Sequence, residues 1–217
     1  IKLMNLVIFG PPGAGKGTQS NFIVNKYNLH QLSTGELLRS EIKNKTSLGK
    51  EISSIMNSGK MVSDKIASDL IEKFVSNKKF QSRLIFDGYP RNIAQAENLN
   101  FLLDKYSQKI DIVLKLSISL DLIKKRISGR SVCSICGKIY NEYFNPAPEN
   151  ADCCAKKYLQ KRIDDTLDIA VTRFKTYEKN IEPVIDYYKK SNILKVVNGE
   201  AQISEINNEI GGLIDGI

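Results

Sequence analysis

A glycine-rich turn near the start of the chain has the residue types that bind phosphate. The apolar run Leu6–Phe9 leads into GPPGAGKGT, residues 10–18, and a helical pattern follows. Glycines let backbone N–H groups turn toward phosphate oxygens, the helix start adds positive potential, and Lys16 can reach the β and γ oxygens. The motif G-x-x-x-x-G-K-[ST] is matched loosely, because Gly17 stands between Lys16 and Thr18. The strand before it and the helix after it favour a phosphate site over an ordinary turn.

Several arginines could complete a site for phosphoryl transfer, a reaction that depends on positioning, charge neutralisation and exclusion of water. Arg126 and Arg130 are four residues apart, so we expect them on one helical face. Arg162 and Arg173 are eleven apart, about three turns, so we expect them on nearly the same face of one long helix. The alternative for each pair is a solvated helix surface.

Asp87 ends a buried strand in this pattern, where an unpaired carboxylate is costly. Oxygen ligands and retained waters suit Mg²⁺, so we expect Asp87 to hold this ion through water.

All four cysteines lie between Cys133 and Cys154. Such clustering indicates a local metal site or free thiols rather than a disulfide scaffold. Cys133-Ser-Ile-Cys136-Gly is a zinc-knuckle pattern, and sixteen residues separate Cys136 from Cys153. These three thiols should reach one ion. The fourth ligand is open between Cys154, Asp152 and a water, and a lid without metal is the alternative, because structural zinc normally has four closed ligands.

The elements that must position these residues alternate between strand and helix. Five short apolar runs (3–9, 31–33, 84–87, 110–116 and 193–197) are separated by stretches with helical spacing, which predicts a parallel sheet covered on both faces by helices. The longest helix is expected over 163–188, with Pro183 kinking it or ending it early. Residues 130–161 have no helical stripe, so they are expected to form a small insertion, such as a lid.

The composition fits one folded domain with insertions. The 217 residues are 41% hydrophobic and 26% charged, which excludes a disordered chain, and no apolar run approaches the roughly 20 residues that span a bilayer. The opening residues have no signal-peptide pattern, so we expect a cytoplasmic protein. The net charge of +8 suits an anionic partner such as a nucleotide, although a solvated lysine-rich surface also explains it.

Three motifs together resemble the nucleoside monophosphate kinases, and the adenylate kinases in particular. They are GPPGAGKGTQ (10–19), STGELLR (33–39) and FDGYPR (86–91), and the resemblance covers essentially the whole chain. It implies an α/β fold of the P-loop NTPase type, in which a five-stranded parallel sheet is flanked by helices. The implied divisions are a core (1–32, 63–129 and 163–217), an AMP-binding segment (33–62) and a lid (130–162).

The resemblance also implies the reaction, MgATP + AMP = 2 ADP, and its residues. The acceptor arginines Arg39 and Arg91 suit an oxyanion through their bidentate forks, and the amide of Gln95 can pair with an adenine edge. The implied ATP-binding residues are Gly13, Ala14, Gly15, Lys16, Gly17, Thr18, Arg126, Arg130, Ile139, Tyr140 and Ala201. The implied AMP-binding residues are Thr34, Arg39, Lys60, Met61, Val62, Gly88, Tyr89, Pro90, Arg91, Gln95, Arg162 and Arg173. Those implied in catalysis are Lys16, Asp87, Arg91, Arg130, Arg162 and Arg173.

Zinc-bearing members of the family complete the metal site with a second C-x-x-[CD]. This chain departs from that pattern, because position 156 is lysine and the extra thiol is Cys154. A structural Zn²⁺ held by Cys133, Cys136, Cys153 and Cys154 is therefore expected with its fourth ligand open.

Two rival functions remain. A kinase for UMP, CMP or GMP is disfavoured by the long insertion after Arg130 and by the Thr34 and Gln95 matches. A basic zinc-ribbon module for nucleic acid would explain the charge and the cysteines but leaves the phosphate loop unexplained. We therefore expect ATP, AMP and ADP as partners, no nucleic acid or membrane partner, and a monomer.

Overall fold

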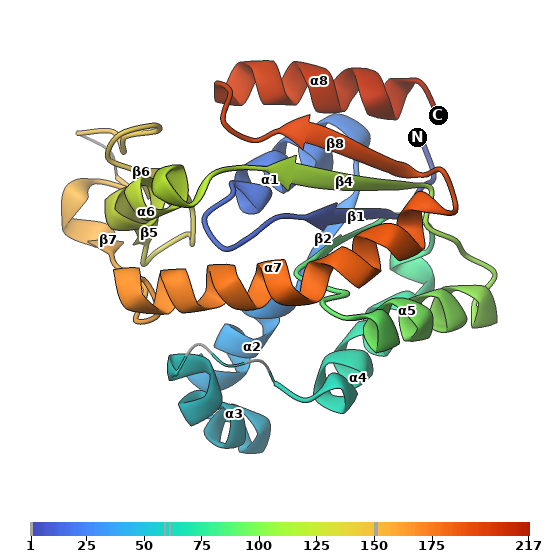
Figure 1. The fold of residues 1–217 in the computed structure, drawn as a ribbon. Helices are drawn as coiled ribbons and strands as arrows, with labels where there is room; N and C mark the ends of the chain where they lie inside the picture. Colours follow the sequence, from blue (N-terminus) through green and yellow to red (C-terminus); the bar gives the residue numbers. More distant parts are fainter. Residues whose placement is uncertain (1, 59, 61, 150–151) are drawn as a thin grey trace.

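A five-stranded parallel sheet forms the centre of the computed structural model, which describes residues 2–58, 60, 62–149 and 152–217. The order is β2-β3-β1-β4-β8, and every pairing is parallel. The predicted fold class is thereby confirmed (Figure 1). The strands are β1 (Leu6–Phe9), β2 (His30–Ser33), β3 (Leu84–Asp87), β4 (Ile112–Ser117) and β8 (Leu194–Asn198).

Helices cover both faces of this sheet, as the alternation of buried residues requires. Successive side chains of a strand point to opposite faces. Leu6 and Ile8 pack on one side with α1 and α8, whereas Val7 and Phe9 pack on the other with α4, α5 and α7. The helix bounds are α1 (Lys16–Tyr27), α4 (Asp64–Val75), α5 (Ile93–Lys105), α7 (Leu167–Lys189) and α8 (Ile203–Asp215).

The central strand β1 lies between β3 and β4; the chain runs from the carboxyl end of β1 to β2 on one side, and from the carboxyl end of β3 to β4 on the other side, so the connections diverge between β1 and β3. Ligands of open α/β sheets bind at such a point. The register pairs Ile8 with Asp87, which brings Asp87 beside the end of β1, next to the glycine-rich turn.

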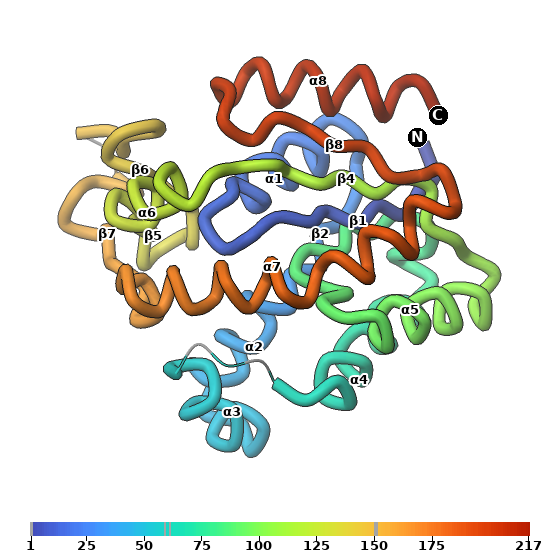
Figure 2. Tube along the Cα trace, viewed as in Figure 1, coloured from blue at the N-terminus to red at the C-terminus, as the bar shows by residue number. Residues whose placement is uncertain are grey.

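Two smaller units project from the core (Figure 2). The first contains α2 (Thr34–Lys43) and α3 (Ser47–Asn57), which pack around Leu38 and Ile52 with Leu70 of α4. The second follows α6 (Leu120–Gly129) and contains an antiparallel sheet in the order β6-β5-β7. Its strands are β5 (Arg130–Cys133), β6 (Ile139–Asn141) and β7 (Leu159–Gln160), and the 3₁₀ turns of the chain are η1 (Lys78–Phe80) and η2 (Lys156–Tyr158).

The long helix α7 differs from its prediction at its start, while its end at Lys189 lies one residue past the predicted position 188. It begins at Leu167 rather than at position 163, and Ile163 is 82% exposed. Thr166 supplies the N-cap, because its hydroxyl accepts the N–H of Ile169. Pro183 does not end the helix, which continues to Lys189 although its axis bends in the second half (Figure 1). Packing of the following turns on the core explains why the helix tolerates this proline.

The two termini meet beside α8 (Figure 2). The Nζ of Lys2 donates to the carbonyl oxygens of Ile214 and Ile217, each at 2.6 Å. Within the described ranges, no helix combines the length and apolar character that crossing a bilayer requires.

Candidate active site

The turn after β1 is shaped to present backbone N–H groups. Gly13 and Gly15 have φ values of 86° and 96°, a left-handed conformation that glycine adopts without strain. Gly15 directly precedes α1, whose first N–H groups have no partner within the helix. The loop therefore combines free donors with the positive end of a helix, which is the arrangement that binds phosphate.

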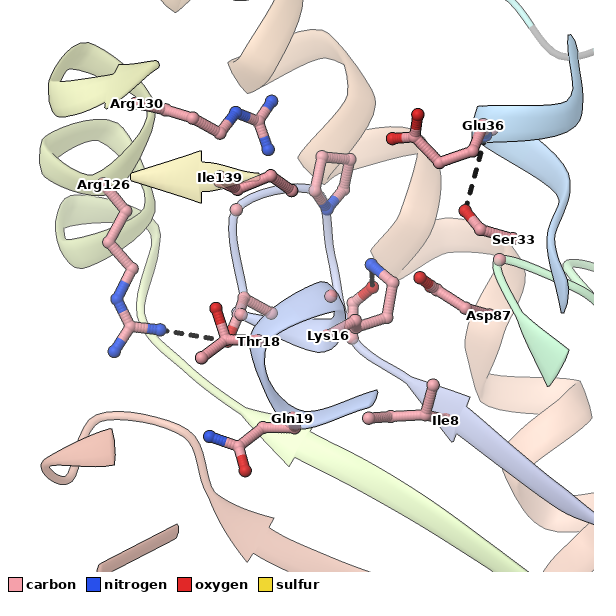
Figure 3. Close-up of a pocket in the computed structure, with 18 of the residues that line it drawn as sticks. Ile8, Lys16, Thr18, Gln19, Ser33, Glu36, Asp87, Arg126, Arg130 and Ile139 are labelled. Carbon is pink, nitrogen blue, oxygen red and sulfur yellow. Dashed lines mark hydrogen bonds between the residues drawn. The ribbon is translucent and has the colours of Figure 1, made fainter. Parts of the chain in front are cut away.

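Lys16 lies over this loop and faces Asp87 (Figure 3). Its Nζ donates to the carbonyl oxygens of Gly10 at 2.8 Å and Pro11 at 3.2 Å. Displacement of water by the surrounding protein lowers the pKa of Lys16 to about 8, and the cations Arg91, Arg173 and Arg130 act in the same direction, while Asp87 opposes them. An ammonium in such surroundings gains most from an incoming polyanion.

Asp87 ends β3 as predicted and is 7% exposed. One of its carboxylate oxygens accepts the amide of Gln31 at 2.9 Å. The carboxylate thus has a fixed position beside Lys16, at the edge of the sheet where a metal–phosphate complex would lie.

One side of the loop is formed by α6 and the lid (Figure 3). Arg126 donates to the carbonyl oxygens of Ala14 and Gly199, each at 2.9 Å, and this fixes its guanidinium against the loop. Arg130 lies just past the end of α6 and is held by the buried carboxylate of Asp165. Ile139 of the lid approaches the loop closely, since a Cβ built on Gly17 would lie 3.6 Å from its Cδ1.

The opposite side is formed by α2 and the turn after β3. Thr34 donates its hydroxyl to the carbonyl of Gly88 at 2.9 Å, and the Nε of Arg91 donates to the same carbonyl at 2.6 Å. Gly88 has a φ of 77°, and an added Cβ would meet Thr34 Oγ1 at 3.0 Å and Arg91 Nη2 at 3.1 Å. A glycine is therefore required there, and Arg91 takes its direction from that turn.

Two acidic side chains, Glu36 and Asp164, each lie between two of the remaining arginines. Glu36 pairs with Arg39 at 2.7 Å and with Arg162 at 2.6 Å. Asp164 pairs with Arg173 at 2.5 Å and lies 3.8 Å from Arg39. Arg162 precedes α7, so the prediction that it shares a helix with Arg173 is wrong, although both arginines line the same cavity.

The sequence reasoning did not assign roles to Glu36, Asp164 and Asp165. Glu36 lies inside the motif 33–39, three residues before Arg39, and the two aspartates lie two and three residues after Arg162. A signal was present, because a cluster of arginines in a partly buried cleft needs nearby carboxylates for compensation.

Most of these residues surround one cavity of about 430 Å³, within the range of small-molecule sites. Seven cationic and three acidic side chains of the described residues line it. The predicted residues along its wall are Gly13, Ala14, Gly15, Lys16, Gly17, Thr18, Arg39, Asp87, Gly88, Pro90, Arg91, Arg126, Arg130, Ile139, Tyr140, Arg162 and Arg173.

Six other predicted residues do not line this cavity in the part of the chain that the structure describes. Tyr89 is buried in the core with 1% exposure, Thr34 and Gln95 are buried behind the wall, Lys60 is exposed, and Val62 and Ala201 are half-buried. The prediction for Met61 lies outside the described residues.

The four cysteines form a cluster in the lid. The Sγ atoms of Cys133, Cys136, Cys153 and Cys154 all lie within 4.8 Å of one another. Cys154 has a φ of 76°, and this left-handed conformation turns its thiol to the same side as that of Cys153. Asp152 is not part of the cluster. Backbone N–H groups of Cys136 and Ile135 lower the pKa of Cys133 to about 6, which favours the thiolate.

A phosphate loop at the carboxyl edge of a parallel sheet, faced by arginines from two projecting units, defines a nucleotide kinase that transfers phosphoryl groups. Comparisons with known proteins narrow this class. A model of the adenylate kinase family matches residues 8–193. The chain belongs to the adenylate kinase family.

Relatives that match over nearly their full length support the same family. The chain is 44% identical to the adenylate kinase of Pelagibacter ubique (strain HTCC1062) over 97% of this chain and 99% of the relative. It is 40% identical to the adenylate kinase of Thermodesulfovibrio yellowstonii, over 98% of this chain and 99% of the relative. It is 39% identical to that of Methanothrix thermoacetophila, over 97% and 98%.

Proposed function

We propose that the cavity binds MgATP and AMP together and transfers the γ-phosphoryl group of ATP to AMP, giving two ADP, in a reversible reaction. The observation that carries this proposal is the convergence of cations on Lys16 from both projecting units. Family membership makes the protein a phosphotransferase of the adenylate kinase type.

The donor nucleotide is assigned to the lid side of the loop. The N–H groups of residues 13–18 and the Nζ of Lys16 would bind the phosphates of ATP, and Arg130 would meet the transferred group. Arg126, fixed against Ala14, would offer a planar guanidinium face to the adenine, beside Ile139 and Tyr140 of the same cavity. Ala201 would lie near the same base, since it is two residues from Gly199, whose carbonyl Arg126 contacts.

The acceptor nucleotide is assigned to the side of α2 and α5. Arg39 and Arg91 would bind the AMP phosphate with bidentate forks, because a guanidinium matches the geometry of an oxyanion. Thr34, Gln95 and the segment 60–62 would contact the nucleoside, as would Gly88, Tyr89 and Pro90 through the turn that they form. Arg162 and Arg173 complete the phosphate site from the α7 side.

The reaction needs little covalent chemistry from the protein. Lys16, Arg91, Arg130, Arg162 and Arg173 would neutralise the charge on the transferring group while holding donor and acceptor in line. Incoming phosphates must displace Glu36 and Asp164 from their arginines, so these carboxylates keep the cations oriented before substrate binds. Closure of the lid would exclude water and prevent hydrolysis of ATP.

Two metal ions fit the donor atoms. Asp87 and the hydroxyl of Thr18 are hard oxygen ligands at the loop, as Mg²⁺ requires, and Mg²⁺ brought by ATP would neutralise charge on the phosphate oxygens.

In the lid, a tetrahedral Zn²⁺ with sulfur ligands at ~2.3 Å needs Sγ atoms about 3.8 Å apart. The Cys133–Cys153, Cys136–Cys154 and Cys153–Cys154 separations of 3.7, 3.3 and 3.5 Å suit a structural zinc with Cys154 as the fourth ligand.

The divisions into a core (1–32, 63–129, 163–217), an AMP-binding segment (33–62) and a lid (130–162) are part of this proposal. So are a monomeric state and a cytoplasmic location, both of which rest on the sequence argument alone.

A panel of acceptors tests the proposal. With MgATP as the donor, kcat/KM should be highest for AMP and at least about 100-fold lower for CMP, UMP and GMP, because a site that hydrogen-bonds one base rejects those that leave its polar groups unpaired. Equal turnover of CMP or UMP would instead favour a pyrimidine nucleotide kinase.

A further inference from the structure

The side chain of Gln95 is held at both ends of its amide. Its Oε1 accepts the backbone N–H of Arg91 at 2.8 Å, and its Nε2 donates to Oδ1 of Asp64 at 2.6 Å. The side chain is 4% exposed. A backbone N–H can only donate and an ionised carboxylate can only accept, so one orientation of the amide satisfies both contacts. Turning it by half a rotation would set donor against donor and acceptor against acceptor.

Asp64 is fixed in turn by Asn92. The Nδ2 of Asn92 donates to both oxygens of the Asp64 carboxylate, at 3.0 and 3.1 Å, while its Oδ1 accepts the N–H of Gln95 at 2.8 Å. Asp64 is the first residue of α4 and closely follows the segment 60–62. The carboxylate thus joins the end of the AMP-binding segment to the start of α5 and is aimed at the amide of Gln95.

These contacts decide which hydrogen-bonding groups of the Gln95 amide are left for a ligand. A primary amide has two N–H donors and two lone pairs, and the contacts above use one of each. One N–H and one lone pair of the amide thus have no partner among the described residues and could pair with a base that reaches Gln95. They match adenine, whose N1 accepts and whose 6-amino group donates. A 6-oxopurine in the same position presents the reverse pattern, O6 as acceptor and N1–H as donor, so each of its groups would oppose a like group.

We propose that Asp64 is a specificity-determining positioning residue, which locks the amide of Gln95 in the orientation that accepts 6-aminopurine monophosphates and rejects 6-oxopurine monophosphates. The inference rests on the proposed function, since it requires Gln95 to meet the acceptor base. A reversed amide would pair with a 6-oxopurine, so the selectivity depends on what holds the amide.

The test compares Asp64→Asn with Asp69→Asn. Asparagine at position 64 can present either oxygen or N–H to Gln95, and therefore permits both amide orientations. Asp69 lies on the same helix, is exposed, and has no hydrogen bond or ion pair within the described part of the chain. The quantity measured is the ratio of kcat/KM for AMP to kcat/KM for IMP, which differs from AMP at the N1 and C6 edge. The KM for ATP is measured beside it.

Asp64→Asn should lower the AMP-to-IMP ratio about tenfold, as expected for loss of a hydrogen bond to a charged group, with an unchanged KM for ATP. Asp64→Ala should lower it as well, while Asp69→Asn should leave it at the wild-type value. A ratio for both Asp64 variants equal to that of Asp69→Asn overturns the inference.

The variant Gln95→Ala distinguishes a failure of this inference from a failure of the proposed adenylate kinase function. Loss of the AMP preference in that variant supports the contact between Gln95 and the base. An unchanged ratio overturns the inference, yet wild-type formation of ADP from ATP and AMP would still uphold the proposed function. Failure of the wild-type protein to form ADP would overturn the proposed function itself.

Discussion

Lys16 is the residue on which both nucleotide sites converge. It lies over the phosphate loop, faces Asp87 and is surrounded by three arginines of the cavity. Replacement by methionine keeps most of the unbranched side chain and removes its ammonium group. Lys16→Met should lower kcat by about 100-fold or more with an unchanged melting temperature, because preorganised charges at transferring phosphates have effects of this size. Steady-state kinetics measures kcat, and thermal unfolding followed by circular dichroism measures the melting temperature.

The matched control is Lys189→Ala, in the last turn of α7. Lys189 is exposed, pairs with Asp186 at 2.9 Å and lies outside the cavity. The Lys189→Ala variant should retain wild-type turnover. Near-normal turnover of Lys16→Met would refute the assignment of the phosphate loop.

The lowered pKa of Lys16 also predicts a pH dependence. Below about pH 8 the ammonium is charged in the free enzyme, and above it the proton is lost, so attraction for phosphate weakens as the pH rises. Since kcat/KM reports the free enzyme, its value for ATP should fall through about pH 8, while kcat should fall at higher pH because bound phosphate stabilises the charge. A kcat/KM that stays constant between about pH 7 and pH 9.5 would contradict this role for Lys16.

Among the elements, the lid depends most on its own internal contacts. Its small sheet has three short strands, and its buried cluster consists of Cys133, Tyr140 and Cys154 with a few half-buried neighbours. Such a unit has too little apolar surface to be stable alone, so a metal would add much of its stability. The protein purified without chelator should contain one zinc per chain, and stripping the metal should lower the melting temperature by several degrees.

Cys154→Ser tests the fourth ligand directly. It should lower zinc content or affinity and the melting temperature, while Ser134→Ala, an exposed change within the same knuckle, should alter neither. Activity at low temperature should persist in both variants, because the cluster contributes structure to the lid rather than charge to the phosphates. Wild-type protein with no zinc and four titratable thiols would show that the lid folds without metal.

At the scale of the whole molecule, the two projecting units are joined across the cavity by an ion pair. Glu36 of α2 contacts Arg162, the last residue of the segment 130–162 that contains the small antiparallel sheet. Substrate phosphates would replace this carboxylate and draw both units inward. Two adenosines linked through five phosphates should therefore bind tightly and reduce the radius of gyration in small-angle scattering. Identical profiles with and without this compound would contradict closure.

Local patterns were sufficient to predict the core. The runs around Leu6, Leu84 and Ile112 are short, apolar and β-branched, and they become the central strands because nothing local competes with that pattern. The start of α7 was misplaced, because Ile163 fits the helical stripe but nothing in its spacing shows that Arg162 and Asp164 are held by partners distant in sequence.

The site residues that lie in sequence motifs could be predicted, whereas those whose position depends on tertiary contacts could not. The loop residues and Arg91 line the cavity as expected, but the carboxylates that orient the arginines come from α2 and the segment before α7, two units brought together only by folding. The position of Cys154 in the cysteine cluster likewise depends on a left-handed backbone conformation, which the residue type does not indicate.

The central claim, that one cavity holds donor and acceptor for direct transfer, is tested most directly by following the phosphoryl group. ATP labelled at the γ-phosphorus is mixed with unlabelled AMP and the enzyme, and the products are separated after a single turnover. We predict that the label appears in the β-position of ADP made from AMP, with almost none in inorganic phosphate. Label released as inorganic phosphate, or retained in ATP in the presence of AMP, would contradict the account.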